Sequence, residues 1–208
     1  MNGKDLERKL SVLVPRTHTQ LDHFGRALRA AGLLPLGGRG LAAPEITPQH
    51  VANMLIALAV AEKPGDAPNA VIGYAAMPVA ECDAAADIDA VADTFGEALL
   101  EILNPSAAGP EVLSVRICRS WPLAIIETKQ GEYSYGYATN ETAREAGFQT
   151  WGAREEFRYG AGVLSQIAFE LAGGNSRRGG WVNGETDPVS RFRASRRAAE
   201  AANSDLEG

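Results

Sequence analysis

Between residues 16 and 39 the chain concentrates basic and hydrogen-bonding side chains that can contact phosphates and base edges. Arginine can neutralise a phosphate or read guanine, while threonine and glutamine can bond to bases or phosphates. These residue types predict a surface that contacts double-stranded DNA, and the alternative for residues 17–47 is a helix-hairpin with no role in DNA binding. The predicted DNA-binding residues are Arg16, Thr17, His18, Thr19, Gln20, His23, Arg26 and Arg39.

Residues that could support catalysis or metal binding do not fall into a functional spacing. His18 and His23 are five residues apart rather than four, and no HExxH pattern accompanies them or His50. The sequence contains neither a GxxxxGK[ST] phosphate loop nor a GxSxG nucleophile motif. We therefore expect that the protein is not an enzyme and has no catalytic residue, metal site or cofactor. Nothing in the sequence identifies a small-molecule ligand.

The 208 residues have the composition of a globular protein, with 45% hydrophobic and 22% charged residues. No apolar run approaches the roughly 20 residues that span a bilayer. The charged start, MNGKDLERKL, lacks the apolar stretch of a signal peptide. The two cysteines, Cys82 and Cys118, argue against a disulfide framework and against a cysteine-based zinc site. These features predict a soluble, cytoplasmic protein without membrane association.

The net charge of −6 is distributed unevenly along the chain. Residues 1–50 carry seven Lys or Arg against four Asp or Glu, a net +3, whereas residues 51–110 carry one lysine against nine acids, a net −8. Such asymmetry lets one segment face phosphates while another is solvated or faces a basic partner. It permits nucleic-acid binding by the N-terminal block.

Two helices separated by a proline are expected to position the DNA-binding residues. Leucines at three- and four-residue spacing predict a short helix over 4–13, and Pro15 ends it. Thr17 or Thr19 can cap the next helix, and Gly32 lies where a left-handed C-cap is expected. The apolar stripe of this second helix comprises Leu21, Phe24, Leu28 and Ala31. In a helix-turn-helix the second helix enters the major groove and its early residues read base edges.

A glycine-rich turn follows, between two short extended pieces at about 33–36 and 41–46. Arg39 lies at the centre of this turn, among glycines that permit positive φ. Thr47 then predicts a helix start with Pro48 at its first position. This helix is apolar around most of its circumference, which is typical of the buried spine of a domain.

The segment ALRAAGLLPLGGRG resembles the LxxxGLL recognition-helix ending and wing of winged helix-turn-helix regulators. The resemblance covers residues 4–60 and implies that Leu28, Leu33 and Leu34 pack on the domain core. It also implies that Arg39, at the wing tip, reaches a neighbouring groove or phosphate. The longer segment from Ala30 to Leu58 is similar to uncharacterised proteins of alphaproteobacterial phages and prophages.

The remainder predicts an α+β protein: an N-terminal winged helix-turn-helix-like domain, a long acidic helix, and a small antiparallel β-meander with a C-terminal helix. Acids and apolar residues alternate over 83–103 as in an amphipathic helix, and period-two patterns in EVLSVRICRSW, PLAIIET and EYSYGYA indicate strands. A further strand, REEFRYG, precedes the helix AGVLSQIAFELAGG. The expected domains are 1–62, a helical connector 63–110, an oligomerisation or partner-binding domain 111–173, and a disordered tail 174–208.

These observations favour a sequence-specific DNA-binding protein, expected to be a phage or prophage transcriptional regulator that forms a homo-oligomer. The alternative is a phage structural, assembly or DNA-packaging component, similar in plan to a terminase small subunit, that acts through protein contacts. The alternating Tyr133, Tyr135 and Tyr137 could stack on bases, although packing is the more common use of such a row. The arginines of the tail either add non-specific DNA affinity or keep that end soluble.

Overall fold

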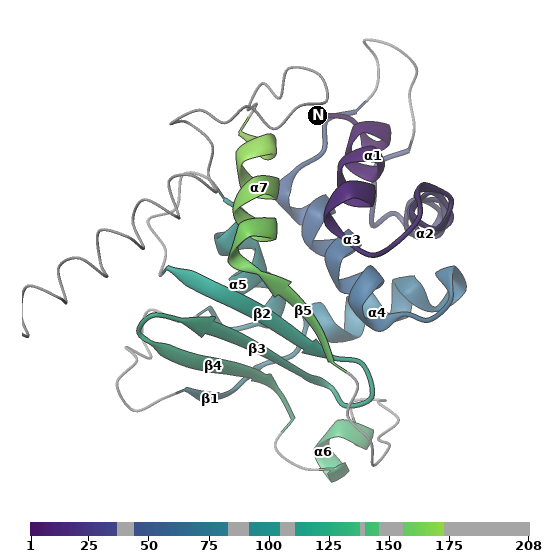
Figure 1. The fold of residues 1–208 in the computed structure, drawn as a ribbon. Helices are drawn as coiled ribbons and strands as arrows, with labels where there is room; N and C mark the ends of the chain where they lie inside the picture. The colour runs from purple at the N-terminus through teal and green to yellow at the C-terminus, as the bar shows by residue number, and fades with distance from the viewer. Residues whose placement is uncertain (37–43, 83–91, 105–110, 138–139, 146–155, 173–208) are drawn as a thin grey trace, which may run out of the picture.

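The computed structural model describes residues 1–36, 44–82, 92–104, 111–137, 140–145 and 156–172. Within these ranges the chain is a mixed α+β structure of seven α-helices and one five-stranded antiparallel sheet (Figure 1). The helices are α1 (Gly3–Leu13), α2 (His18–Ala30), α3 (Pro48–Val60), α4 (Ala67–Ala75), α5 (Phe95–Leu103), α6 (Asn140–Glu145) and α7 (Ala161–Leu171), with the 3-10 helix η2 (Pro64–Asp66) before α4. The strands are β1 (Val79–Cys82), β2 (Val112–Cys118), β3 (Leu123–Thr128), β4 (Gly131–Gly136) and β5 (Glu156–Gly160).

The sheet has the strand order β1-β4-β3-β2-β5, with helices packed over one face (Figure 1). Alternation along β2 follows the period of two: Val115 and Ile117 enter the core, and Arg116 points to the opposite face. Both α3 and α7 contact β2 and β5. The predicted meander is confirmed as β2–β3–β4, and the predicted strand before the last helix is confirmed as β5, which pairs with β2 rather than β4.

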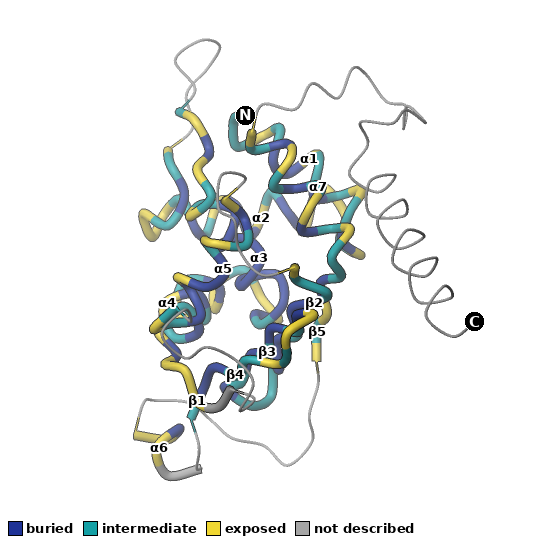
Figure 2. The backbone as a smooth tube through the Cα atoms, turned by 90° about the vertical axis from the view of Figure 1, so that its left-hand side faces the viewer, coloured by how far each residue is buried: buried dark blue, intermediate teal, exposed yellow. Residues whose placement is uncertain are grey.

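Helix α3 runs through the middle of the molecule, where the tube is dark blue (Figure 2). Every residue from Val51 to Ala59 is buried, as the apolar sequence predicts. The Tyr159 hydroxyl of β5 donates to the Leu55 carbonyl at 2.8 Å. At the C-terminal end, Arg16 donates to the Leu58 carbonyl at 3.3 Å and Arg119 to the Ala59 carbonyl at 3.2 Å. Two cations therefore satisfy the negative end of this helix from two different parts of the chain.

The tyrosine row is a packing feature. Tyr135 is buried and its ring centroid lies 5.9 Å from that of Phe95, while Tyr133 and Tyr137 are half-buried against the same core. Burial raises the pKa of the Tyr135 hydroxyl, with the Glu101, Tyr133 and Glu97 side chains acting in the same direction. Tyr135 therefore joins the sheet to α5.

The acidic helix starts later than predicted. Residues 92–94 are not helical, because the chain there is paired with residues 77–79, at the start of β1: Val79 N–H donates to the Asp93 carbonyl and Phe95 N–H to the Met77 carbonyl. Thr94 then caps α5, accepting from Glu97 N–H at 3.3 Å. Glu97 and Glu101 are exposed, as the pattern predicts.

Parts of the sequence-based interpretation lie beyond the described ranges. They include the glycine-rich turn around Arg39, residues 83–91 of the predicted acidic helix, and the predicted tail, 174–208. The short β1 and α6 were not predicted. The domain boundaries stay predictions, and one hydrophobic core spans residues on both sides of 62 and of 110. No helix among the described residues is long and apolar enough to cross a membrane.

His50 closes the start of α3 in a way that requires a neutral ring. Its Nδ1 accepts a hydrogen bond from the backbone N–H of Thr47 at 3.1 Å, so this nitrogen cannot carry a proton. Burial lowers the pKa of His50 below its ordinary value of 6.5. The imidazole therefore has the role that a glutamate or glutamine has in a capping box.

This arrangement predicts that stability depends on pH through His50. Because the pKa is lower in the folded chain, the contribution is complete above the ordinary value of 6.5 and is lost as the pH falls through the folded-state pKa. His50→Gln keeps an acceptor at the same helix position but cannot titrate. In urea unfolding at about pH 8 and about pH 5, the wild type should lose more free energy of unfolding than the variant does. Equal losses in the two proteins would contradict this role for His50.

Candidate nucleic-acid interface

Local capping sets both ends of α2. Thr17 is the N-cap: its hydroxyl accepts from Gln20 N–H at 3.3 Å, and Gln20 Oε1 accepts from Thr17 N–H at 3.0 Å. At the other end Gly32 has a φ of +74°, and the N–H groups of Leu33 and Leu34 both donate to the Leu28 carbonyl. The predicted glycine C-cap is confirmed, and of the two candidate threonines Thr17 is the cap.

The inner face of α2 is anchored in the core. Leu21, Phe24 and Leu28 are buried, and Leu34 is buried just after the helix. Asn53 of α3 donates from its side chain to the Leu33 carbonyl at 2.8 Å, which fixes the segment that leaves α2. The predicted packing roles of Leu28 and Leu34 are confirmed, and Leu33 is half-buried against the same core.

A buried ion pair joins α1 to α2. Glu7 of α1 pairs with Arg29 of α2, and the glutamate side chain is 1% exposed. Gly25 makes room for this pair, because a Cβ at that position would lie 2.5 Å from Glu7 Oε1. The second oxygen, Oε2, has no hydrogen-bond partner among the described residues. Breaking a buried pair leaves an uncompensated charge, so this contact constrains how α2 sits on α1.

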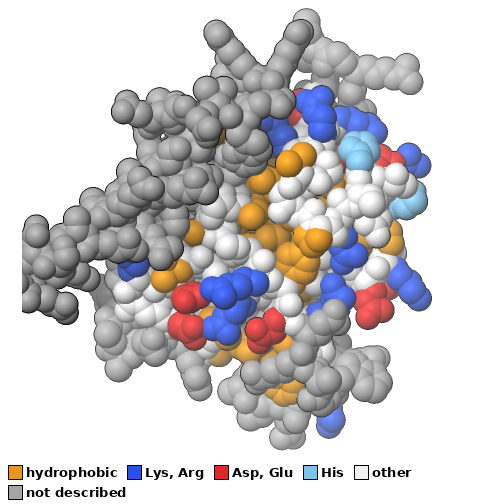
Figure 3. All heavy atoms as spheres, viewed as in Figure 1, with side chains coloured by type: hydrophobic (Ala, Val, Ile, Leu, Met, Phe, Trp, Pro, Cys, Tyr) orange, Lys and Arg blue, Asp and Glu red, His pale blue; other side chains and the backbone are white. Residues whose placement is uncertain are grey.

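The outer face of α2 is defined here as His18, Thr19, His23 and Arg26, which are all exposed. Thr19, His23 and Arg26 follow helical spacing along one side, opposite the buried stripe. Lys, Arg and His side chains gather on the part of the surface formed by α1 and α2, at the upper right of the view (Figure 3). This face therefore offers hydrogen-bonding groups and positive charge to a ligand.

Charged side chains of α1 extend this face. Asp22 of α2 accepts from Arg26 at 2.6 Å and from Lys4 of α1 at 3.3 Å, and Arg8 pairs with Asp5 at 2.6 Å. Although partial desolvation of Asp22 acts to raise its pKa, the hydrogen bonds and charges of Lys4 and Arg26 hold the pKa below the ordinary value. Lys4 and Arg8 were not among the predicted residues, and their spacing of four along α1 is the signal that could have included them.

The other predicted residues are arranged differently. Arg16 is half-buried and its guanidinium is directed to the Leu58 carbonyl, while Thr17 and Gln20 are exposed and bonded to each other as the cap. Arg39 lies outside the described residues, and its role stays a prediction.

The two extended pieces expected beside the glycine-rich turn lie partly within the described residues. Residues 33–36 and 44–46 form no paired strand. Leu33 and Leu34 instead bond back to the end of α2, and Ile46 N–H donates to the Met1 carbonyl at 2.9 Å. The wing therefore stays a prediction: in the described positions the flanks make these backbone contacts with the end of α2 and with Met1, which precedes α1.

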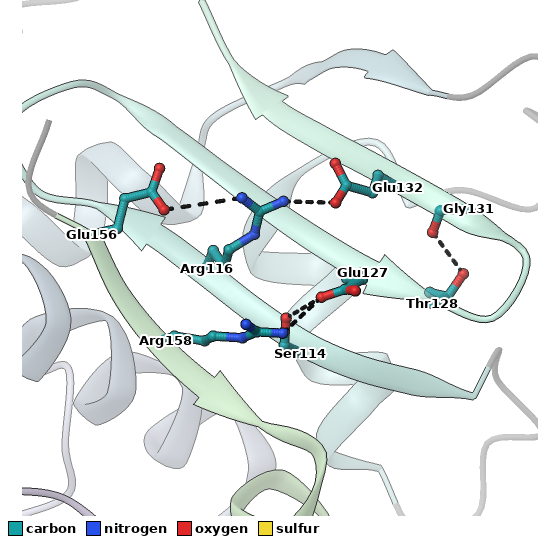
Figure 4. A network of polar contacts seen from close by, with 8 residues as sticks. All are labelled: Ser114, Arg116, Glu127, Thr128, Gly131, Glu132, Glu156 and Arg158. Carbon is teal, nitrogen blue, oxygen red and sulfur yellow. Dashed lines mark hydrogen bonds and ion pairs between the residues drawn. The ribbon is translucent and has the colours of Figure 1, made fainter.

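A second polar surface covers the face of the sheet that points away from α3 (Figure 4). Arg116 lies between Glu132, at 2.7 Å, and Glu156, at 4.0 Å. Glu127 accepts from Arg158 at 2.9 Å and from the Ser114 hydroxyl at 2.8 Å. These cross-strand contacts pair both arginines with carboxylates, which is typical of sheet stabilisation. No cluster of His, Cys, Asp and Glu able to hold a metal ion occurs in the described part of the chain.

Comparison of the chain with protein-family models, with curated proteins and with solved structures finds no match. The function must therefore be argued from the geometry of its own residues.

The Glu7–Arg29 pair predicts an unusual response to a glycine substitution in a helix. Gly25→Ala should lower the free energy of unfolding by about 1–3 kcal/mol, because the added methyl group meets the buried carboxylate. Gly162→Ala in α7 is the matched control, since nothing lies within 4 Å of a Cβ there. That variant should be unchanged or more stable by up to about 1 kcal/mol in urea unfolding. A stabilised Gly25→Ala variant would show that the two helices are not held at this spacing.

Proposed function

We propose that this protein binds double-stranded DNA through the outer face of α2, with α1 and α2 acting as a helix-turn-helix. One observation carries the proposal: α2 is anchored on one side, capped at both ends, and polar and basic on its exposed side. In Figure 1, α1 is seen from the side and α2 end-on, so the two helices cross, as in a helix-turn-helix.

Each group on the outer face has a use in such a complex. His18 and Thr19 lie in the first turn of α2, the part of a recognition helix that reaches base edges. Thr19 can donate and accept hydrogen bonds. Arg26 lies about two turns further along the same side of α2 and can contact a phosphate. The cap formed by Thr17 and Gln20 supports this face by fixing the first turn.

The finer parts of the proposal rest on the sequence. A wing that carries Arg39 is supported by the glycine-rich turn around that residue and by the resemblance to winged regulators. A role as a phage or prophage transcriptional regulator rests on the same resemblance. Arg16 remains among the proposed DNA-binding residues because it lies beside the first turn of α2. Its hydrogen bond to the Leu58 carbonyl is a second role.

A second candidate function is that of an assembly or packaging component that acts as a homo-oligomer. Exposed apolar side chains favour it: Val12 is 72% exposed, Leu36 76% and Ile72 59%. Side chains of this kind are the ones that protein interfaces bury. Sedimentation of the protein with and without duplex DNA separates the two functions, since a large DNA-independent oligomer supports assembly.

The DNA-binding proposal predicts a difference between two exposed arginines, each of which pairs with a carboxylate. Arg26→Ala, alone and with Thr19→Ala and His23→Ala, should weaken binding to a fluorescein-labelled duplex in anisotropy titrations. We expect a loss of about tenfold or more for the triple variant, and a decrease of up to about 0.9 in the slope of log affinity against log salt for Arg26→Ala.

The matched control is Arg158→Ala on the sheet, where the arginine pairs with Glu127. It removes the same charge and should leave binding unchanged, and thermal unfolding should show that all variants are folded. Equal effects of Arg26→Ala and Arg158→Ala, or no binding by the wild type at low salt, would refute the proposal.

A further inference from the structure

Two cations from two different helices converge on one carboxylate at the edge of the outer face of α2. Lys4 Nζ of α1 lies 3.3 Å from Asp22 Oδ1, and the Arg26 guanidinium of α2 lies 2.6 Å from Asp22 Oδ2. The side chains of Lys4 and Arg26 are 71% and 70% exposed, whereas that of Asp22 is 14% exposed. The carboxylate is therefore seated on the protein while its two partners extend into solvent.

This arrangement differs from two other ion pairs made by α1 and α2. The Glu7–Arg29 pair is buried between the helices, and the Arg8–Asp5 pair lies within one helix. At Asp22 one negative charge is shared by two positive charges, so the cluster has an excess of one positive charge. A phosphodiester oxygen is an acceptor of the same charge as the carboxylate, and Arg and Lys are the residues that most often bind it.

We propose that Lys4 and Arg26 form a binding site for a phosphate of the DNA backbone, and that Asp22 occupies this site in the free protein. The inference rests on the proposed DNA-binding function, and it adds Asp22 as a residue that competes with the phosphate. A phosphate must displace Asp22 from one or both cations, so Asp22 lowers the affinity for phosphate alone. Binding then depends more strongly on the base contacts of the outer face, because these must offset the lost ion pairs.

The test replaces Asp22 and measures affinity and salt dependence together. Asp22→Asn should bind a short duplex of random sequence about three- to tenfold more tightly than the wild type. Its slope of log affinity against log salt should be steeper by about 1–2, since each released cation adds about 0.9. Adding Lys4→Ala to Asp22→Asn should remove about half of the extra slope, because one of the two cations is then missing.

Glu145→Gln on α6 is the matched control, since it removes the same charge at the end of the molecule opposite to α1 and α2 (Figures 1 and 2). It should leave both quantities at the wild-type values. An equal gain for Glu145→Gln would show that only net charge matters, and an unchanged Asp22→Asn slope would show that Asp22 does not compete with phosphate. Either result overturns the inference.

The failure of this inference can be told apart from failure of the proposed function. If the wild type binds duplex through Arg26 but Asp22→Asn gains no affinity, only the competition by Asp22 is refuted. Absence of binding in both proteins would remove both proposals. Exposed ion pairs contribute about 0–1 kcal/mol, so Asp22→Asn should remain folded. If thermal unfolding shows that Asp22→Asn is not folded, Lys4→Ala in the wild-type background is the second variant. It should change the slope of log affinity against log salt by less than about 0.9, because Asp22 already holds this cation.

Discussion

A helix that is apolar around most of its circumference must be covered on nearly every side, and α3 imposes this requirement on the rest of the chain. Its nine residues from Val51 to Ala59 are buried, and each large apolar side chain contributes about 1.5–3 kcal/mol when removed from water. No single neighbour can cover such a helix. Helices α2, α4 and α5 and strands β2 and β5 therefore all contact it. Tyr159, Arg16 and Arg119 bond to its carbonyls from these different directions.

Coverage of α3 also determines which side of α2 remains free. Leu21, Phe24 and Leu28 enter the core that α3 defines, and the Glu7–Arg29 pair holds α1 across the same side of α2. The opposite side is left with hydrogen-bonding and basic groups that no described element covers. Helix α1 is in turn tied to α7 by the pair between Lys9 and Glu170. The proposed interface is thus a consequence of how the core is packed, since the exposed groups lie on the side of α2 that does not pack into the core.

Features that depend on neighbouring residues could be predicted from the sequence. The start and end of α2 follow from Thr17 and Gly32, the burial of α3 follows from its composition, and the meander follows from alternation along β2–β4. These signals act over a few residues, so they do not need the tertiary structure.

Features that depend on distant residues could not be predicted in the same way. The four-residue β1 follows a proline and pairs with β4, more than fifty residues further along the chain. The late start of α5 comes from pairing of Asp93 with Val79, which overrides a helical pattern that continues to its N-terminal side. The orientation of Arg16 toward Leu58 and the meeting of Lys4 with Asp22 depend on how helices pack, which residue spacing alone does not contain.

The central claim, that DNA contacts the outer face of α2 and not the sheet, is tested most directly by hydrogen exchange with and without a duplex. DNA binding at this face should slow amide exchange in peptides that cover α1 and α2 and leave exchange in β2, β3 and β4 unchanged. Slower exchange confined to the sheet strands, or no change anywhere at a duplex concentration well above that of the protein, would contradict it.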